Sequence, residues 1–331
     1  TFLVAVVAGY EAMGRIARSV APSCINRGFH PTAATGTFGA AAAVGKVLGF
    51  DDDLMLNALS VAGSHSSGLN EFTQTGGSVK RIHAGVAAFG GMRAALLARA
   101  GLSGPPTVLE GESGFWHAFS DEFRAERLTS GFGRDFVLLG TSYKRYACCH
   151  QLHAAIDATS KIVGEHGLKA DDIESIVMGT NKAALRIVGT ITEPKDVTES
   201  QFSATYGLAM CVVKGGNGFS DYNEDNLQDP EIGKLARRVR LEADEEAEAQ
   251  FPDKRAVRVT VTTKDRKAYQ QRLDGPRGTP DNPITRSDVQ EKFRSLAAMV
   301  LPGARVEEIV NAVQRLDSLG TVSTLSKLLV S

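Results

Sequence analysis

The sequence predicts a mainly α-helical protein with an inserted α+β domain. Three observations lead to this prediction: helical patterning with dense Ala and Gly over residues 1–135, strand patterns over 136–276, and helical patterning again over 277–331. A strand-bearing segment between two helical ones is expected where a smaller domain is inserted into a larger one. We therefore predict a large helical domain built from both chain ends and a smaller α+β domain between them, with a ligand site in the cleft.

The first part of the chain carries four predicted helices. They cover residues 2–20, 35–49, 52–63 and 79–100. Asp51 is a good N-cap for the third helix, and Gly101 suits the position just after the end of the fourth. Because Ala and Gly let helix backbones approach closely, these segments predict a tightly packed bundle.

The inserted segment mixes strands with helices. The residues FVLLGTSYKRY at 136–146 look extended, and 150–167 have helical spacing. A strand is expected over 172–181 and a helix over 200–215. Residues 255–274 read as a hairpin, in which an alternating Val/Thr strand is followed by a polar turn and a return strand.

The composition is that of a soluble globular protein. The 331 residues carry a formal net charge of −1, so no overall field attracts nucleic acid. Glu11 and Arg15 interrupt the apolar first helix, which argues against a membrane span. Four cysteines without a pairing pattern favour a reducing, cytoplasmic compartment. The chain begins at Thr1 with a helix already under way, so we expect it to be part of a longer protein.

The first candidate site is the turn RGFHPT, residues 27–32. Pro31 disfavours helical geometry at His30 and places this histidine just before a helix. The positive end of that helix would lower the pKa of the imidazole and favour the neutral, proton-accepting form. A simple turn histidine bonded to backbone is the alternative, and the local sequence alone favours it.

The second candidate site is KRIHAG, residues 80–85, which opens the fourth helix after the polar loop EFTQTGGS. Lys80, Arg81 and His83 put three basic side chains at a helix N-terminus, where they oppose the macrodipole. Lys80 and His83 share a face, because residues three apart are neighbours on a helix. The segment is either an anion site or a solvated basic turn.

The third candidate site is SYKRYACCHQLH, residues 142–153. Its two cysteines are adjacent, whereas structural zinc sites space paired cysteines two to four residues apart, so no metal is expected. Buried thiols are the better account of Cys148 and Cys149. Lys144 lies between two tyrosines, whose packing could desolvate the amine and lower its pKa.

Motifs for cofactors are missing from the sequence. It has no G-x-G-x-x-G after a predicted strand, no Walker A pattern, no H-E-x-x-H and no G-x-S-x-G. It also lacks a cysteine framework for an iron–sulfur cluster. We therefore expect no cofactor and a reaction carried out by side chains.

The motifs together resemble the MmgE/PrpD family. They are GYE, RGFHPT, KRIHAG, LEGESGFWHAF, SYKRYACCHxxHAAIDA and PDNPIT…KF, and they occur in the family's order over essentially the whole chain. The resemblance implies a large helical domain with a smaller α+β lid, a homodimer, no organic cofactor and a substrate with two or three carboxylates. It also implies an earlier segment, rich in Asp and His, to which nothing in this chain corresponds.

The resemblance places the family's active-site histidine on His30 and its two lysines on Lys80 and Lys144. Cations suit a polycarboxylate substrate, and a positioned base suits proton removal beside a carboxylate. We assign His30 to proton transfer, and Lys80 and Lys144 to carboxylate binding or to protonation of the leaving hydroxyl. Arg81, His83 and Tyr143 are assigned to substrate binding.

The implied reaction is that of a lyase, with dehydration of a 2-methylcitrate-like hydroxy tricarboxylate as the first expectation. Decarboxylation or epimerisation of a related di- or tricarboxylate is the alternative, since these reactions begin from similar chemistry. A non-catalytic carboxylate-binding relative is the third alternative. We expect no nucleic-acid or membrane partner.

Overall fold

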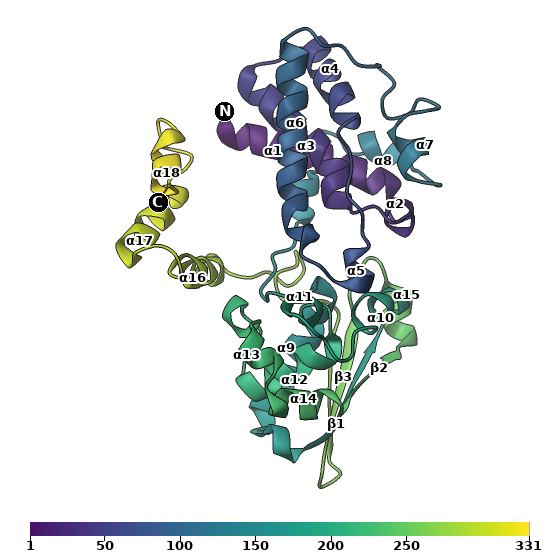
Figure 1. The fold of residues 1–331 in the computed structure, drawn as a ribbon, viewed down its shortest axis with the longest axis vertical. Coiled ribbons are helices and arrows are strands. Elements are labelled where there is room, and N and C mark those ends of the chain that lie inside the picture. The colour runs from purple at the N-terminus through teal and green to yellow at the C-terminus, as the bar shows by residue number, and fades with distance from the viewer. Residues whose placement is uncertain (331) are drawn as a thin grey trace. The chain divides into compact units, whose positions relative to one another are not determined.

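A computed structural model describes residues 1–330 of the chain. The chain forms two compact units (Figure 1). The first, here the helical unit, comprises Thr1–Thr141 and Arg315–Thr324; the second, here the α+β unit, comprises Ser142–Gln314 and the residues from Leu325 onward. The predicted mainly α class with a small sheet is confirmed. The predicted domain boundaries stay a prediction.

The helical unit is built on four long helices that agree with the predicted ones. They are α1 (Phe2–Val20), α3 (Pro31–Leu48), α4 (Asp52–Gly63) and α6 (His83–Arg99). The Asp51 carboxylate accepts a hydrogen bond from the backbone N–H of Leu54 at 2.9 Å, as expected of an N-cap. Gly101 follows the end of α6 with φ +98°, which suits glycine at this position.

Small residues bring the helix backbones together, as predicted. A Cβ added at Gly9 of α1 would lie 2.8 Å from the carbonyl oxygen of Gly39 in α3. A Cβ at Gly91 of α6 would lie 2.4 Å from the carbonyl oxygen of Thr37 in α3. Helix α3 therefore packs against both α1 and α6 at a separation that larger residues would not allow.

The core of the helical unit includes aromatic residues, some of them from its short helices. Phe38 of α3 is fully buried and meets Phe115 edge-on, with ring centroids 5.2 Å apart. The indole N–H of Trp116 donates to the hydroxyl of Ser19 at 2.9 Å. The short helices are α2 (Ser23–Asn26), α5 (Phe72–Thr75), η1 (Val79–Ile82), α7 (Phe115–Phe119), α8 (Glu126–Thr129) and η2 (Val137–Gly140).

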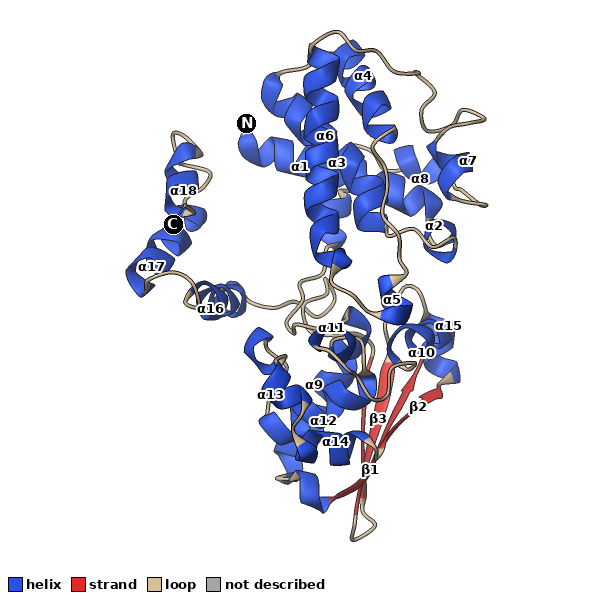
Figure 2. Ribbon diagram, viewed as in Figure 1, coloured by secondary structure: helices blue, strands red, loops and turns tan. Residues whose placement is uncertain are grey.

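The α+β unit contains a four-stranded mixed sheet in the order β2-β1-β3-β4 (Figure 2). Strand β1 (Ile173–Thr180) pairs in parallel with β2 (Val239–Ala243) and antiparallel with β3 (Val257–Thr263). Strand β3 continues through a tight turn into β4 (Ala268–Leu273), which confirms the predicted hairpin. Residues of β3 alternate between buried and half-buried, as expected of a strand with one face on a core.

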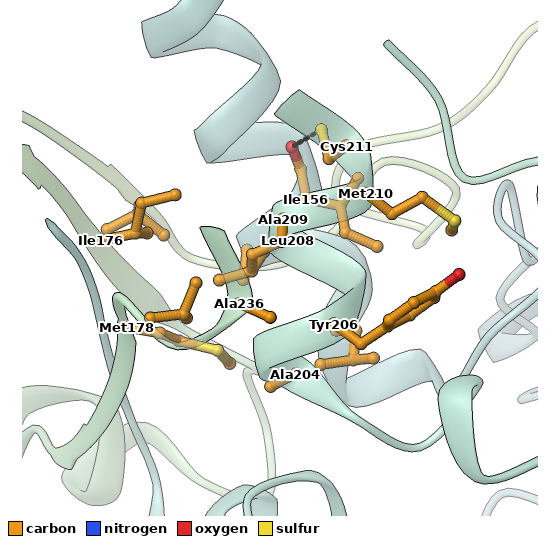
Figure 3. Close-up of a cluster of buried hydrophobic side chains, with 14 of the residues drawn as sticks. Ile156, Ile176, Met178, Ala204, Tyr206, Leu208, Ala209, Met210, Cys211 and Ala236 are labelled. Carbon is orange, nitrogen blue, oxygen red and sulfur yellow. Dashed lines mark hydrogen bonds between the residues drawn. The ribbon is translucent and has the colours of Figure 1, made fainter. Parts of the chain in front are cut away.

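Helices α9 (His153–His166) and α12 (Ala204–Lys214) supply much of this unit's core (Figure 3). Leu208 and Met210 of α12 are fully buried together with Ile156 of α9 and Ile176 of β1. The other helices are η3 (His150–Leu152), η4 (Ala170–Asp172), α10 (Lys182–Val188), α11 (Val197–Ser200), η5 (Phe219–Asp221), α13 (Glu224–Leu227), α14 (Pro230–Ala236), α15 (Glu245–Gln250), α16 (Arg286–Ala297), α17 (Gly303–Gln314) and α18 (Ser323–Leu328).

One sequence-based expectation for the sheet was wrong, and one strand was not predicted. Residues 136–146 form no strand; they begin with the single turn η2 and continue irregularly, because the apolar run is interrupted at Gly140 and has no partner strand in residues 1–330. Strand β2 was missed, since its exposed Arg240, Glu242 and Ala243 hide the pattern of an edge strand. In the described part of the chain, no helix is long and apolar enough to cross a bilayer.

Candidate active site

His30 occupies the turn between α2 and α3, in the conformation that Pro31 predicts. Its backbone is extended, with φ −87° and ψ 113°, and Pro31 is the first residue of α3. The His30 N–H donates to the carbonyl of Gly68 at 3.0 Å, and the His30 carbonyl accepts from the N–H of Ala34 at 3.1 Å. The backbone at this position is therefore fixed on both sides, while the side chain remains half-buried.

The imidazole of His30 meets that of His83, the first residue of α6. Their Nδ1 atoms lie 2.8 Å apart, within hydrogen-bond distance. One Nδ1 must carry a proton and donate it to the other, so the two rings hold complementary tautomers when both are neutral. His83 is only 5% exposed, whereas His30 is half-buried. His30 is therefore the ring of the pair that a ligand can reach more readily.

Phe72 and Gly68 shape the surroundings of this pair. The Phe72 ring is buried and meets both imidazoles edge-on, 5.2 Å from His30 and 5.7 Å from His83 between centroids. Gly68 has φ +96°, and a Cβ there would lie 2.4 Å from the Cβ of Ala33. Only glycine lets this loop lie so close to the start of α3. The sequence reasoning missed both residues, although Phe72 is the sole aromatic in the polar loop EFTQTGGS.

Lys80 lies near the same pair. It belongs to η1, a 3-10 helix with three residues per turn that ends at His83. Lys80 and His83 are three residues apart and therefore lie on the same side of this turn. Its Nζ lies 5.6 Å from the centroid of Phe72, a cation–π distance. The structure thus brings together three of the predicted site residues, His30, Lys80 and His83. Arg81 is exposed, and within residues 1–330 its guanidinium forms no hydrogen bond with either histidine.

The pKa of His30 is lowered from 6.5 to about 4. Burial is the largest cause, followed by the neighbouring His83 and the charge of Lys80. The predicted lowering of the His30 pKa is confirmed, but its main cause is burial of the ring and not the N-terminus of the helix. His30 is therefore neutral at pH 7 and able to accept a proton.

Lys144 and Tyr143 lie in the α+β unit. Lys144 is exposed, and its Nζ donates to the carbonyl of Cys148 at 3.0 Å. Tyr143 is 57% exposed. The expectation that two tyrosines enclose and desolvate Lys144 was therefore wrong: the irregular chain at 142–146 turns Tyr143 outward, and Tyr146 instead donates to the carboxylate of Asp157 at 2.6 Å.

The segment after Lys144 contains two cysteines and two histidines. Cys148 is buried as predicted, whereas Cys149 is half-buried. Cys148 is 5% exposed, and burial raises the pKa of its thiol to about 12, so it stays protonated. The rings of His150 and His153 meet edge-on, with centroids 4.8 Å apart. Burial, with nearby cations, lowers the pKa of His150 to about 4 and that of His153 to about 3.

Three buried or half-buried histidines should make the protein sensitive to acid. His30, His150 and His153 all have folded-state pKa values below 6.5, so the unfolded chain binds more protons between about pH 4 and 6.5. The free energy of unfolding should rise with pH across that window and level off above it. Urea unfolding at a series of pH values measures the slope. In the variant His153→Gln the slope near pH 5 should fall by about 1.4 kcal/mol per pH unit, the value for one proton; an unchanged slope would contradict the assignment.

Comparison with known proteins identifies the family. The model of the MmgE/PrpD N-terminal domain matches residues 1–128, and that of the C-terminal domain matches residues 146–318. A cis-aconitate decarboxylase of Aspergillus terreus is 30% identical over 99% of this chain and 70% of its own length. The human cis-aconitate decarboxylase is 30% identical over 99% of this chain and 68% of its own length.

A second group of relatives matches a shorter part of the chain. The 2-methylcitrate dehydratase of Cupriavidus necator is 29% identical over 68% of this chain and 48% of its own length. Both groups are enzymes, and the two domain models between them cover most of the sequence. The chain belongs to the MmgE/PrpD family.

Proposed function

We propose that this chain is a lyase that decarboxylates cis-aconitate or a close tricarboxylate analogue without a cofactor. The observation that carries the proposal is the similarity to cis-aconitate decarboxylases over 99% of the chain. The similarity to a 2-methylcitrate dehydratase extends over 68%. This reverses the order that the sequence motifs suggested, in which dehydration came first.

The reaction requires an electron sink and a proton. The bond between the methylene carbon and its carboxylate breaks, CO2 leaves, and the electron pair enters the allylic system and the carboxylate at its far end. A proton then adds to the far carbon, so a tricarboxylate and one proton become a dicarboxylate and CO2. The protein must therefore hold the remaining carboxylates, stabilise the delocalised negative charge and deliver one proton.

The pair of His30 and His83 suits the proton delivery. His30 is neutral in the free protein because burial and cations lower its pKa. A bound trianion is an opposite charge and raises that pKa, so the imidazole takes up a proton when the substrate arrives and can then donate it. His83 is buried and bonded to Nδ1 of His30, so it orients the ring. Lys80, beside this pair, binds a carboxylate.

The remaining predicted site residues are kept in the proposal. Lys144 of the α+β unit is assigned to a second carboxylate, and Tyr143 of the same unit and Arg81 of the helical unit are assigned to further substrate contacts. All three are exposed, which suits residues that meet a ligand from solvent. We keep the homodimer as part of the proposal.

Dehydration of 2-methylcitrate is the second candidate, favoured by the relative from Cupriavidus necator. The two reactions share the demand for carboxylate binding and proton transfer, but dehydration expels a hydroxyl group. Lys80 or Lys144 would then protonate the leaving oxygen.

One experiment separates the candidates. The protein is incubated with cis-aconitate, 2-methylcitrate and iminodisuccinate in separate samples, and each is followed by proton NMR. Decarboxylation gives new terminal methylene signals from cis-aconitate alone, and this is the expected result. Turnover of 2-methylcitrate alone would replace the proposal with dehydration. An absence of turnover in all three samples would favour a non-catalytic carboxylate-binding protein.

A further inference from the structure

Helices α16 and α17 follow one another in the chain (Figure 1), and a groove lies between them. The short connection 298–302 joins the end of α16 to the start of α17. Close to this connection, Nε and Nη2 of Arg294 donate to the two carboxylate oxygens of Glu307 at 2.6 and 2.9 Å. This bidentate ion pair holds the two helices together. Beyond it lies a cavity of about 380 Å³, a volume typical of small-molecule sites.

Apolar side chains form the floor and the rim of this groove. Ile309 and Val310 of α17 line it and are buried. Phe293 of α16 lines it and is half-buried, while Val289 and Val313 line it and are exposed. A groove with a buried apolar floor and an open rim suits the apolar part of a small molecule.

In the described part of the chain, one cation and two amide side chains also line the groove. Arg286 and Gln290 lie one turn apart on α16, and Gln314 is the last residue of α17. Arg286 and Gln314 therefore stand at the helix ends that are farthest from the connection. No acidic side chain of residues 1–330 lines the groove. Its cationic end and its apolar floor together suit an amphiphilic anion.

The charge of Arg286 is not compensated by a neighbouring acid. Within residues 1–330, no ion pair joins Arg286 to a carboxylate. The carboxylate of Asp288, two residues later, accepts instead from the guanidinium of Arg277 at 3.0 Å. Arg294, at the other end of α16, is paired with Glu307. Since a guanidinium offers a planar fork of donors that matches a carboxylate, the groove complements a single carboxylate.

We propose that this groove is a binding site for a monocarboxylate with an unbranched apolar chain, such as a fatty acid. The carboxylate lies on Arg286, and the chain lies against Phe293 and Ile309. A di- or tricarboxylate would place a second charge on the apolar floor without a partner, which is costly. A second copy of the hairpin, packed on the groove by a two-fold axis, would cover two unpaired Arg286 side chains. None of the lining residues is assigned to the reaction, so the site is separate from that of the substrate.

The test titrates decanoate, below its micelle concentration, into the full chain by isothermal titration calorimetry. Arg286→Met should weaken the dissociation constant about 10- to 100-fold, the range for losing a hydrogen bond to a charged group. Arg286→Lys should bind more tightly than Arg286→Met, because it keeps the charge. Val313→Glu should weaken binding by about 10-fold or more, because it puts a carboxylate beside the apolar chain of the ligand.

Two control variants leave the groove intact. Val300→Glu adds the same charge to an exposed valine of the connection, and Arg240→Met removes an exposed arginine of β2. Both should bind decanoate as the parent does. Unchanged binding in Arg286→Met and Val313→Glu, or no binding by the parent, overturns the site. Decyltrimethylammonium carries a cation on the same chain and should bind about 10-fold more weakly than decanoate or worse, because Arg286 repels it. Equal affinity for the two would overturn the assignment to a carboxylate.

A second measurement uses the parent protein without substitutions. Backbone hydrogen exchange is followed by mass spectrometry with and without decanoate. Exchange should slow over residues 289–293 and 309–314 but not over β3, and no slowing at the hairpin overturns the proposal. Tricarballylate, a tricarboxylate, should leave exchange at the hairpin unchanged; slowing there would assign the groove to the substrate instead. Sedimentation velocity tests the remaining occupant, because a parent dimer that Val313→Glu dissociates would make the groove an interface between copies and overturn the proposal.

Discussion

The variant His30→Asn should turn over cis-aconitate about 100- to 10,000-fold more slowly than the parent, the range for losing a positioned proton-transfer group. Asparagine is close to histidine in size and can still bond to His83, but it cannot carry the proton. The loss should appear mainly in kcat, because Lys80 and Lys144, to which we assign carboxylate binding, remain. Steady-state kinetics, with NMR as the readout, measure the effect.

A matched histidine elsewhere in the helical unit provides the control. His117 of α7 is exposed, and its Nδ1 bonds to the carbonyl of Gly111 at 3.0 Å. His117→Asn should leave turnover unchanged. His83→Asn should fall between the two, since it removes the ring that orients His30 but leaves the proton-transfer group. Full turnover by His30→Asn with an intact circular dichroism spectrum would remove His30 from the mechanism.

Local signals in the sequence predicted the helical unit well. Asp51 and Gly101 marked helix ends correctly, and the dense small residues predicted the close contact now seen between Gly9 and Gly39. These features depend on neighbours in the sequence or on side-chain size, so one sequence can reveal them. Strand β2 depends on pairing with β1, which lies about sixty residues earlier, and its own pattern did not reveal it.

The candidate site likewise combines features that the local sequence predicts with features that depend on distant residues. The extended conformation of His30 follows from Pro31 alone, and the sequence predicted it. The 2.8 Å contact with His83 joins residues 53 positions apart, so only the packing of α3 on α6 produces it. For Lys144 the local sequence was misleading. Its neighbouring tyrosines suggested that the side chain is enclosed, but the irregular backbone leaves it exposed. At the candidate site, the sequence thus predicted the backbone conformation of His30 but not the side-chain contacts of His30 and Lys144.

Glu11 and Arg15 were read in the sequence only as charges that interrupt an apolar helix. In the structure Arg15 is 4% exposed, and its Nε donates to the Glu11 carboxylate at 2.9 Å. The guanidinium also donates to three backbone carbonyls of a segment more than a hundred residues later, those of Leu128 in α8 and of Ser130 and Asp135 in the loop after it. A single side chain of α1 thus holds residues 128–135 against the bundle.

Arg15→Ala should therefore lower the free energy of unfolding by about 3–5 kcal/mol, the range for removing one partner of a buried ion pair. Urea unfolding measures this loss, and limited proteolysis should show new cleavage within residues 128–135. The neighbouring Arg18 is exposed on the same helix, and Arg18→Ala should change stability by no more than about 0.5 kcal/mol. Equal losses in the two variants would contradict the role given to Arg15.

A double variant separates the ion pair from the loop contacts. Replacing both partners with apolar residues, Glu11→Leu with Arg15→Met, removes the stranded charge that Arg15→Ala leaves behind. It does not restore the donors to the three loop carbonyls, nor the acceptor that Glu11 offers to the N–H of Leu138 at 3.2 Å. Stability should recover in part, while the new cleavage in the loop persists. Full recovery of both would mean that the loop is held by packing, such as Phe132 against the guanidinium, and not by the hydrogen bonds.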